Sequence, residues 1–336
     1  MVFPGPAYAP ANELYKHIPG MTTPAQLPVS GNWHNLRAGE EQVKISVIIP
    51  TWNRARRLLP ALDSVCKQTH PADEILVIDD GSTDDTRARV AAGFPGVRYH
   101  YQGNRGVSHA RNAGIRLAAG DWIALLDSDD QWHPAKLERQ VRALTENPAF
   151  RICHTDEIWI RNGKRVNPMH KHAKQGGRIF RHSLPRCAIS PSAVLIRKDL
   201  LQEIGNFDEH LPACEDYDLW LRLCARHPVL FLEEPLTIKY GGHPDQLSRR
   251  YWGMDRFRVY ALEKVIRSGV LSASDHAAAV QMLLEKAAIV YQGAVKHDNT
   301  ELAREYRSIQ ASYTALLADM QATRNPCPPL CTEPAG

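Results

Sequence analysis

The sequence lacks any run of about 18 consecutive apolar residues, so no transmembrane helix is expected. It also lacks a basic segment followed by an apolar stretch near its N-terminus, so no signal peptide is expected. A net charge of +4 is too small to indicate a nucleic-acid partner, although a mildly basic surface favours anionic substrates and membranes. These absences predict a cytoplasmic protein, with peripheral association at the inner face of the membrane as a further expectation.

The chain also lacks the cysteine pairs of a disulfide framework or a zinc finger. It has seven cysteines, an odd number. Five lie in or beside apolar segments and are expected to be reduced thiols: Cys66, Cys153, Cys187, Cys214 and Cys224. Cys327 and Cys331 have the spacing of a metal or disulfide pair, but no second pair at zinc-finger spacing accompanies them. The pattern indicates a reducing compartment, the cytoplasm.

The remaining composition is that of an ordinary soluble protein, with 43% apolar and 23% charged residues. A length of 336 residues is enough for one large α/β domain and a smaller appendage. Proline and glycine are frequent in residues 1–41 and no clear period is present, which indicates an N-terminal extension.

Short apolar runs alternate with helical patterns along residues 42–148. Strands are expected at residues 43–49, 74–78, 97–101 and 122–126. Helices are expected at residues 58–66, 109–119 and 136–146. Pro50 is expected to end the first strand, because proline cannot donate to a ladder. The alternation predicts an α/β fold with an open, mostly parallel sheet flanked by helices.

Beyond residue 150 the alternation is looser. Strands are expected at residues 152–159, 193–196 and 229–239, with a helix at 211–225. Residues 162–182 are basic and rich in glycine and histidine, and are expected to form a mobile loop. Three helical segments, at residues 255–268, 274–297 and 300–323, predict a helical C-terminal region with a loose tail. The expected domains are residues 1–41, 42–253 and 254–336.

The stretch GDWIALLDSDDQW, residues 120–132, begins as a buried strand and ends in carboxylates. Asp127, Asp129 and Asp130 repel one another unless solvent or a cation reaches them. Carboxylate oxygens suit Mg²⁺ or Mn²⁺, and ligands bind at the carboxyl ends of strands in open α/β sheets. One interpretation is a metal–diphosphate site. The other is an acidic turn in which Asp130 or a neighbour caps the helix after Pro134.

Two other places combine carboxylates with the start of a helix. The second strand ends in DDGSTDDT, where Ser82 to Asp85 is a helix-start signal. Glu215 and Asp216 stand at the acidic beginning of an amphipathic helix. By itself this pair indicates only that acids favour a helix N-terminus.

Four motifs stand in a fixed order along the chain: SVIIPTWNR (46–54), DEILVIDDGSTDDT (73–86), GVSHARNAGI (106–115) and GDWIALLDSDDQW (120–132). The ordered set resembles the family 2 inverting glycosyltransferases of the GT-A fold, over residues 44–243. The resemblance implies a Rossmann-like sheet in which residues 42–148 bind a nucleotide-sugar and residues 149–253 bind the acceptor.

The resemblance implies a base-binding loop after the first strand. Pro50, Thr51, Trp52 and Asn53 match that loop, and Trp52 offers a flat face on which a pyrimidine can stack. Asp80 matches the carboxylate that accepts from a base N–H, which favours uracil. Without the other motifs, a buried loop aromatic would be the preferred interpretation of Trp52.

The acidic stretch matches the metal-binding triplet of the family, Asp127-Ser128-Asp129, which also belongs to the nucleotide-sugar site. Asp129 is expected to bind Mn²⁺ or Mg²⁺ directly, and Asp127 or Asp130 to contact the ribose or a water in the metal's shell, because a divalent cation stabilises charge on the departing diphosphate. Arg54 and Arg111 are expected to pair with the diphosphate. Taken alone, these two arginines are typical of solvated helix faces.

The acceptor half supplies the catalytic acids implied by the resemblance. Asp216 is expected to take the proton from the acceptor hydroxyl as it attacks the anomeric carbon, with Glu215 in support. His243 stands where many GT-A enzymes bring a late histidine or aspartate to the metal, although a lone histidine is more often structural.

Two segments bear on the acceptor. Residues 246–252, QLSRRYW, resemble the Q-x-x-R-W pattern of processive members, but Arg250 and Tyr251 intervene before Trp252. No transmembrane helix follows either, so transfer of a single sugar is expected. The basic segment 164–181 is expected to cover the donor, to contact an anionic lipid-linked acceptor, or to have no role.

The predicted function is metal-dependent transfer of one sugar from a nucleotide-sugar, preferably a UDP-sugar, in bacterial polysaccharide or glycoconjugate assembly. The expected partners are that donor and a saccharide or lipid-linked saccharide acceptor, with a homodimer through the C-terminal helices left open. One alternative is a sugar-phosphate nucleotidyltransferase, although residues 50–57 lack the expected glycines. Another is a non-catalytic sugar- or nucleotide-binding module.

Overall fold

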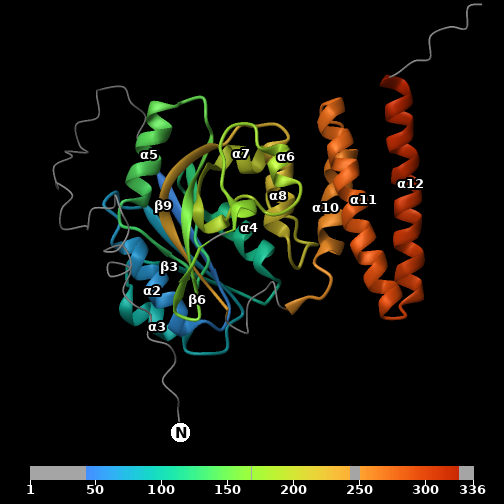
Figure 1. Ribbon diagram of the computed structural model, residues 1–336. Helices are drawn as coiled ribbons and strands as arrows, with labels where there is room; N and C mark the ends of the chain where they lie inside the picture. Colours follow the sequence, from blue (N-terminus) through green and yellow to red (C-terminus); the bar gives the residue numbers. More distant parts are fainter. Residues whose placement is uncertain (1–42, 168, 243–249, 325–336) are drawn as a thin grey trace, which may run out of the picture. The chain divides into compact units, whose positions relative to one another are not determined.

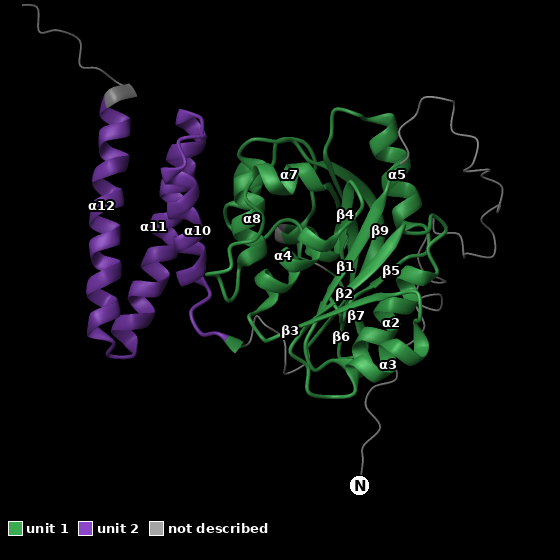
Figure 2. Cartoon of the chain, turned by 180° about the vertical axis from the view of Figure 1, so that it is seen from behind, with its two compact units in different colours: residues 1–250 green, residues 251–336 purple. Residues whose placement is uncertain are grey.

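The computed structural model describes residues 43–167, 169–242 and 250–324 of the chain (Figure 1). The chain divides into two compact units, residues 1–250 and 251–336 (Figure 2). The first contains a sheet flanked by helices, and the second is helical. The five cysteines that lie in the described ranges are free thiols, as expected, whereas Cys327 and Cys331 lie outside those ranges.

Within its described residues, the first unit forms one nine-stranded sheet in the order β3-β2-β1-β4-β8-β6-β9-β5, with β7 paired to β6. The first half of the sheet consists of β1 (Ile45–Thr51), β2 (Glu74–Asp80), β3 (Arg98–Gln102) and β4 (Trp122–Leu125). All pairs among these four strands are parallel. The helices between them are α2 (Ala55–Cys66), α3 (Thr86–Gly93) and α4 (Val107–Leu117). The predicted parallel half of the sheet is therefore confirmed.

Every residue of β1 is buried, which explains its continuous apolar sequence. The prediction that Pro50 ends this strand is wrong, because β1 continues to Thr51 and pairs with β2 along its length. Carbonyls of Lys44 and Ile48 face β4, so the nitrogen of Pro50 faces β4 as well. Proline therefore ends the pairing with β4 and leaves the ladder with β2 intact.

The second half of the sheet is mixed. It consists of β5 (Gln131–Trp132), β6 (Ile152–Arg161), β7 (Lys164–Val166), β8 (Val194–Arg197) and β9 (Leu230–Gly241). Strand β8 runs antiparallel to β4 and β6, whereas β6 and β9 are parallel. The short strand β5 follows the acidic stretch directly and pairs antiparallel with β9. This pairing brings the late segment of the chain to the end of β4.

The prediction of a loop across residues 162–182 is wrong in part. Asn162 and Gly163 have positive φ angles of 49° and 74° and form the turn of a β6–β7 hairpin. A 3₁₀ turn, η2 (His170–His172), and a short helix, α6 (Phe180–Ser183), follow. Periodicity missed these elements because each is shorter than the windows in which a period becomes visible.

Four further elements complete the first unit: α5 (Lys136–Glu146), η3 (Pro191–Ala193), α7 (Lys198–Glu203) and α8 (Glu215–Cys224). Its main apolar core joins β1, β2 and β4 to α2 and α5 through buried side chains such as Leu58, Leu62 and Trp132. This core fixes the strands whose carboxyl ends carry the predicted site.

The second unit contains three helices, as predicted: α10 (Asp255–Arg267), α11 (Ala273–Lys296) and α12 (Thr300–Arg324). The side chain of Ser272 caps α11 by accepting from the backbone N–H of Asp275 at 3.1 Å. Tyr306 and Tyr313 of α12 are 5% and 7% exposed and anchor that helix. No helix in the described ranges is both long enough and apolar enough to cross a membrane.

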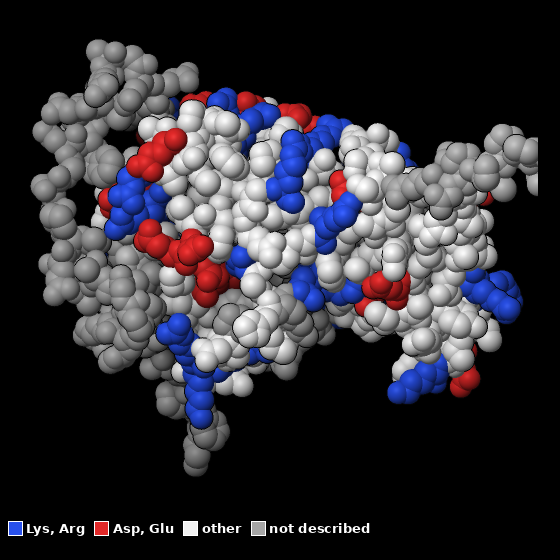
Figure 3. Space-filling view, turned by 45° about the horizontal axis from the view of Figure 1, so that its top comes forward, with Lys and Arg blue, Asp and Glu red and all other residues white. Residues whose placement is uncertain are grey.

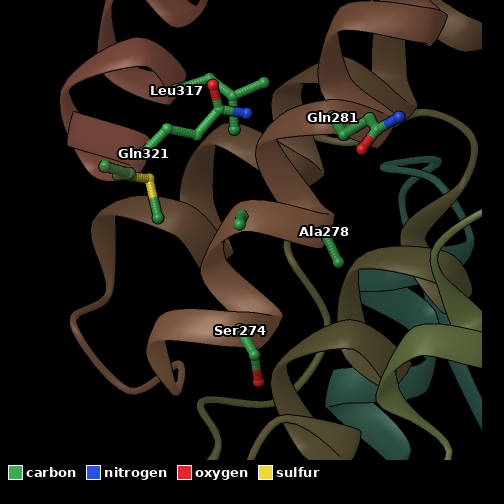
Figure 4. A pocket seen from close by; sticks show the side chains of 7 residues that line it. Ser274, Ala278, Gln281, Leu317 and Gln321 are labelled. Carbon is green, nitrogen blue, oxygen red and sulfur yellow. The ribbon is translucent and has the colours of Figure 1, made fainter. Parts of the chain in front are cut away.

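A groove of about 270 Å³ lies between α11 and α12 (Figure 4). Its walls are small and apolar side chains with two glutamines: Ser274, Ala277, Ala278, Gln281, Leu317, Met320 and Gln321. On the face of the molecule in Figure 3, basic side chains are interspersed with acidic ones and do not gather into one patch. The lining of the groove contains no charged side chain, so we assign no catalytic role to it.

Candidate active site

The acidic stretch lies at the carboxyl edge of the parallel strands. The last rung joins the N–H of Leu126 to the carbonyl of Ile48, and the chain then turns with the N–H of Asp130 on the carbonyl of Asp127. The N–H of Asp127 donates to the hydroxyl of Ser192 at 3.1 Å. Ser192 lies in η3, directly before β8, so the segment that leads into β8 fixes this turn. Ser128 within the turn is buried.

Two predicted arginines contact the two candidate metal ligands. Arg54 Nη1 lies 2.8 Å from Asp129 Oδ2, with 21% and 13% of the side chains exposed. Arg111 Nη2 lies 2.6 Å from Asp127 Oδ1, and its Nη1 lies 2.6 Å from Glu215 Oε1. The interpretation of these arginines as solvated helix-face charges is therefore wrong.

Arg111 joins the carboxyl edge of the parallel strands to helix α8, because Asp127 follows β4 and Glu215 begins α8. Its side chain is 4% exposed. Burial alone would lower the pKa of Arg111, but Asp127 and Glu215 outweigh burial and raise it above its usual range. The pKa of Glu215 is raised by burial and by Asp216, against the opposing effect of Arg111. The two predicted halves of the site thus meet at one buried guanidinium.

Asp130 does not cap a helix, so that interpretation is wrong. Helix α5 begins at Lys136, and the residue before it, Ala135, makes no side-chain cap. Asp130 is 1% exposed and accepts from Ser192 Oγ at 2.7 Å and from the N–H of Tyr240 at 3.1 Å. Burial raises the pKa of Asp130 to about 8, and Lys239 opposes that rise. Asp130 therefore ties the acidic turn to β9.

The base-binding loop predicted after β1 is linked to the loop after β2 through Asn53. Asn53 has a φ of +51°, which asparagine tolerates better than most residues. Its Oδ1 accepts from the N–H of Thr83 at 2.7 Å, and its own N–H donates to Ser82 Oγ at 2.8 Å. In this geometry Asn53 holds the two loops together.

In that loop Trp52 has an exposed ring and Thr51 has a hydroxyl without a hydrogen-bond partner among the described residues. The Trp52 side chain is 41% exposed, so it is not a buried loop aromatic. The guanidinium of Arg250 lies 5.4 Å from the centroid of its ring. Thr51 Oγ1 is buried and has no hydrogen-bond partner among the described residues. The neighbouring Pro50 is buried within β1.

Asp80 orders the loop between β3 and α4. Its Oδ1 accepts from Gln102 Nε2 at 2.7 Å and from the N–H of Arg105 at 2.9 Å, and its Oδ2 accepts from the N–H of Gly106 at 2.7 Å. Gly81, with a φ of +87°, permits close approach because a Cβ there would lie 2.8 Å from the nitrogen of Asn104. Asp80 thus has a structural function whatever ligand it also contacts.

Asp216 lies in the first turn of α8. That helix starts from Cys214, whose left-handed φ of 61° turns the chain. Asp216 Oδ1 accepts from the N–H of Tyr217 at 2.7 Å, and its Oδ2 lies 3.1 Å from the sulfur of Cys187. Cys187 is a neighbour that the sequence motifs did not indicate, because it is 29 residues away.

Lys239 is a second residue that sequence reasoning missed. Its Nζ lies 3.8 Å from Asp130 Oδ2 and 2.6 Å from Ser190 Oγ. Burial would lower the pKa of Lys239, but Asp130, Glu157 and the other two aspartates raise it above its usual range. The only signal in the sequence was its place near the end of a strand. His243 and residues 246–249 of the QLSRRYW segment lie outside the described residues.

The donor set fits a hard divalent cation that shares its shell with a substrate. Asp127 and Asp129 offer carboxylate oxygens, the ligands that Mg²⁺ and Mn²⁺ prefer. In residues 43–167, 169–242 and 250–324, no group of three or more metal-ligating side chains comes together. Two carboxylates with water and a diphosphate complete such a shell.

Comparisons of sequence place this arrangement among known proteins. The model of the family described as Glycosyl transferase family 2 matches residues 46–205. An "Uncharacterized glycosyltransferase" of Rickettsia felis is 36% identical over 197 residues, which are 58% of this chain and 32% of that protein. The chain thus spans about a third of that relative. The Escherichia coli UDP-Glc:alpha-D-GlcNAc-diphosphoundecaprenol beta-1,3-glucosyltransferase WfgD is 33% identical over 185 residues, 53% of this chain and 69% of WfgD.

Solved structures share the fold. Residues 1–349 of Staphylococcus aureus TarS, in complex with UDP-GlcNAc, match with a TM-score of 0.56 at 18% identity, covering 81% of this chain and 92% of that one. The mannosyltransferase PcManGT of Pyrobaculum calidifontis, in complex with GDP-Man and Mn²⁺, matches with a TM-score of 0.51 at 19% identity, covering 84% and 87%. The predicted GT-A fold is confirmed, and the chain belongs to glycosyltransferase family 2.

Proposed function

We propose that the chain is a metal-dependent inverting glycosyltransferase that moves one sugar from a UDP-sugar to an acceptor hydroxyl. The observation that carries this proposal is the double ion pair of Arg111, which links Asp127 of the donor half to Glu215 beside Asp216. A leaving-group site and a base must lie at one place for in-line displacement. The buried side chain of Arg111 holds Asp127 of the first and Glu215 beside the second in place.

The donor base is proposed to bind between the loops after β1 and β2. The exposed face of Trp52 can stack a pyrimidine, with Arg250 displaced from it or retained on its other face. The unpartnered hydroxyl of Thr51 supplies a hydrogen bond inside the same loop. Asp80 Oδ1 already accepts two hydrogen bonds from its own chain, whereas Oδ2 accepts one and retains a lone pair for a base N–H.

The diphosphate is proposed to lie beside Asp127 and Asp129. A divalent cation bound there would stabilise the charge that gathers on the leaving oxygen. Arg54 then has a choice of partners, because a cation on Asp129 competes for the carboxylate that Arg54 contacts at 2.8 Å. The released guanidinium can pair with a phosphate oxygen. Arg111 keeps Asp127 in place throughout.

Asp216 is proposed to accept the proton of the acceptor hydroxyl as the anomeric carbon is attacked. Its Oδ1 accepts from the backbone N–H of Tyr217 and its Oδ2 faces the sulfur of Cys187, so neutral groups hold this carboxylate in place. Glu215, bound to Arg111, keeps the first turn of α8 in place. One carboxylate therefore reacts and its neighbour supports it.

The acceptor is proposed to be a lipid-linked saccharide of bacterial glycoconjugate assembly, reached at the inner face of the membrane. WfgD, by its name, acts on a diphosphoundecaprenol-linked sugar, and 33% identity over 185 residues supports the same acceptor class here. The exposed side chains of Lys164 and Arg165 in the β6–β7 hairpin give a basic edge that suits an anionic carrier.

The first experiment is thermal unfolding with Mn²⁺ and each of UDP, GDP, CDP, TDP and ADP. A ligand that binds only the native state raises the unfolding free energy by mass action, by about 2.7 kcal/mol at a concentration of 100 Kd, and so raises the melting temperature. UDP with Mn²⁺ is expected to give the largest shift. Asp129→Asn is expected to remove the Mn²⁺-dependent part.

Each outcome of that panel has a consequence. A larger shift with GDP than with UDP would mean that guanine, and not uracil, binds beside Asp80 and Trp52. A shift with UDP that is unchanged by chelation removes the metal from the proposal. No shift with any nucleotide, together with no release of nucleotide from UDP-glucose or UDP-N-acetylglucosamine, contradicts the proposed function and leaves a non-catalytic module.

A further inference from the structure

Neutral donors hold both oxygens of the Asp216 carboxylate. Its Oδ1 accepts from the backbone N–H of Tyr217 at 2.7 Å, and its Oδ2 lies 3.1 Å from Cys187 Sγ. The same sulfur lies 3.0 Å from the carbonyl oxygen of Ile189. Because both atoms that face the sulfur are acceptors, the sulfur must carry its proton and donate it.

The surroundings keep Cys187 in its thiol form. Burial raises its pKa well above the usual value, and the adjacent carboxylate of Asp216 raises it further. Lys174 and Lys239 are the cations that face the thiol, and they oppose this shift without cancelling it. Cys187 is therefore neither a thiolate nucleophile nor a metal ligand at neutral pH.

We propose that Cys187 is a positioning residue for the general base, orienting the Asp216 carboxylate through an S–H···Oδ2 hydrogen bond. The inference rests on the proposed function, because it needs Asp216 to be the base. Cys187 precedes η3 and Asp216 lies in the first turn of α8, so this contact joins two segments of the acceptor half.

A thiol suits this position for a physical reason. It is a weak, neutral donor, so it restricts the rotation of the carboxylate without placing a positive charge beside it. An arginine or lysine at the same place would hold the carboxylate more strongly, but would favour its charged form and weaken it as a base. The weakness of the donor is therefore what makes it useful beside a base.

The kinetic test compares Cys187→Ala with Cys187→Ser, using hydrolysis of UDP-glucose or UDP-N-acetylglucosamine in the presence of Mn²⁺. The alanine variant is expected to lower kcat roughly 5- to 10-fold with little change in KM, as loss of one hydrogen bond does. The acid limb of its pH–rate profile is expected to move to higher pH. Serine retains a donor and is expected to restore both.

Cys224→Ala is the matched control. It removes a buried thiol at the far end of α8, the helix that contains Asp216, and is expected to leave kcat and the pH–rate profile unchanged. If Cys187→Ala behaves like this control, the inference is wrong. If serine and alanine at position 187 are equally impaired, the thiol only fills space, and the inference is also wrong.

A second readout does not depend on activity. The S–H stretching band of Cys187 is isolated as the infrared difference between the wild-type protein and Cys187→Ala. Asp216→Asn offers a weaker, neutral acceptor, so the band is expected to move to higher wavenumber. An unmoved band shows that the thiol donates to Ile189 instead and overturns the inference. A chain that hydrolyses no donor but shows the band shift loses the proposed function and keeps the contact.

Discussion

At the carboxyl end of β4 the carboxylates face cations, whereas at the start of α8 the side chain of Asp216 faces neutral donors. Arg111 pairs with Asp127 at 2.6 Å and Arg54 pairs with Asp129 at 2.8 Å. Asp216 accepts from a thiol and from a backbone N–H. A carboxylate paired with arginine holds its negative charge firmly, and one held by neutral donors remains a better base. The two regions thus suit different duties, ligand and base.

The sharpest way to break this comparison is Asp216→Asn. The substitution keeps size and one acceptor oxygen, so the fold and UDP binding are expected to persist. Turnover of the UDP-sugar is expected to fall about 10²- to 10⁴-fold, the range for loss of a general base. The measurements are nucleotide release and the UDP-dependent thermal shift on the same preparation. Retained turnover would mean that another carboxylate takes the proton.

The next largest effect is expected for Arg111→Gln. Arg111 and Glu215 have side chains 4% and 5% exposed, so the substitution leaves a buried carboxylate without its counter-ion. Removing one partner of a buried pair costs about 3–5 kcal/mol of unfolding free energy. Urea unfolding at constant slope measures it. A loss below about 1 kcal/mol would place this pair with exposed ion pairs and remove its role as the link between halves.

The sequence located the ends of strands well and the partners across the sheet poorly. Asp80, Asp127 and Asp129 follow apolar runs, and the carboxyl ends of parallel strands share one edge, so their gathering followed from local patterns. Arg111 was placed with this group through the motif that contains it. Its second contact, with Glu215, is 104 residues away, and no local period specifies such a pair.

Cys187, Lys239 and the burial of Asp130 could not be predicted for the same reason. All three depend on β8 inserting between β4 and β6, and on β9 reaching β5. That order is set by the fit of whole strands, and not by any short stretch of sequence. The position of Asp130 illustrates the consequence, because its partners are Ser192 and the N–H of Tyr240.

A smaller effect is expected for Arg54→Gln. Arg54 is the arginine that we propose exchanges Asp129 for a phosphate oxygen when the cation binds. Arg54 and its ion-pair partner Asp129 are both partly exposed, so stability is expected to change by less than about 1 kcal/mol. Mn²⁺ is expected to bind more tightly in the absence of nucleotide, because its competitor for Asp129 is gone. UDP is expected to bind less tightly, while UMP changes less. Calorimetric titration with each ligand measures these changes.

Arg56→Gln is the control for that experiment, since Arg56 is exposed in the first turn of α2, two residues after Arg54. It removes the same charge without touching Asp129. Equal effects of the two variants on Mn²⁺ affinity would mean that general charge, and not the contact at Asp129, is responsible.

The smallest effect on activity is expected for Lys136→Met. This substitution tests how neutral surroundings act on a charged group outside the candidate site. Lys136 is fully buried with neutral partners: its Nζ donates to Gln140 Oε1 at 2.8 Å and lies 4.0 Å from the Trp132 ring centroid. Burial lowers the pKa of Lys136 to about 7. Burial among neutral groups therefore favours the uncharged form of this lysine.

The sign of the effect follows from proton linkage. Between about pH 7 and pH 10 the unfolded chain holds the lysine proton more tightly than the folded chain, so the unfolding free energy of the wild-type protein should rise with pH. Lys136→Met removes the group and should flatten that rise, with higher stability than wild type at pH 7 and similar stability at pH 10. Urea unfolding at both pH values measures the difference, with sugar transfer unchanged. An equal rise in both proteins would show that Lys136 keeps its charge on Gln140 and Trp132, and that neutral donors and an aromatic face suffice for a cation in this core.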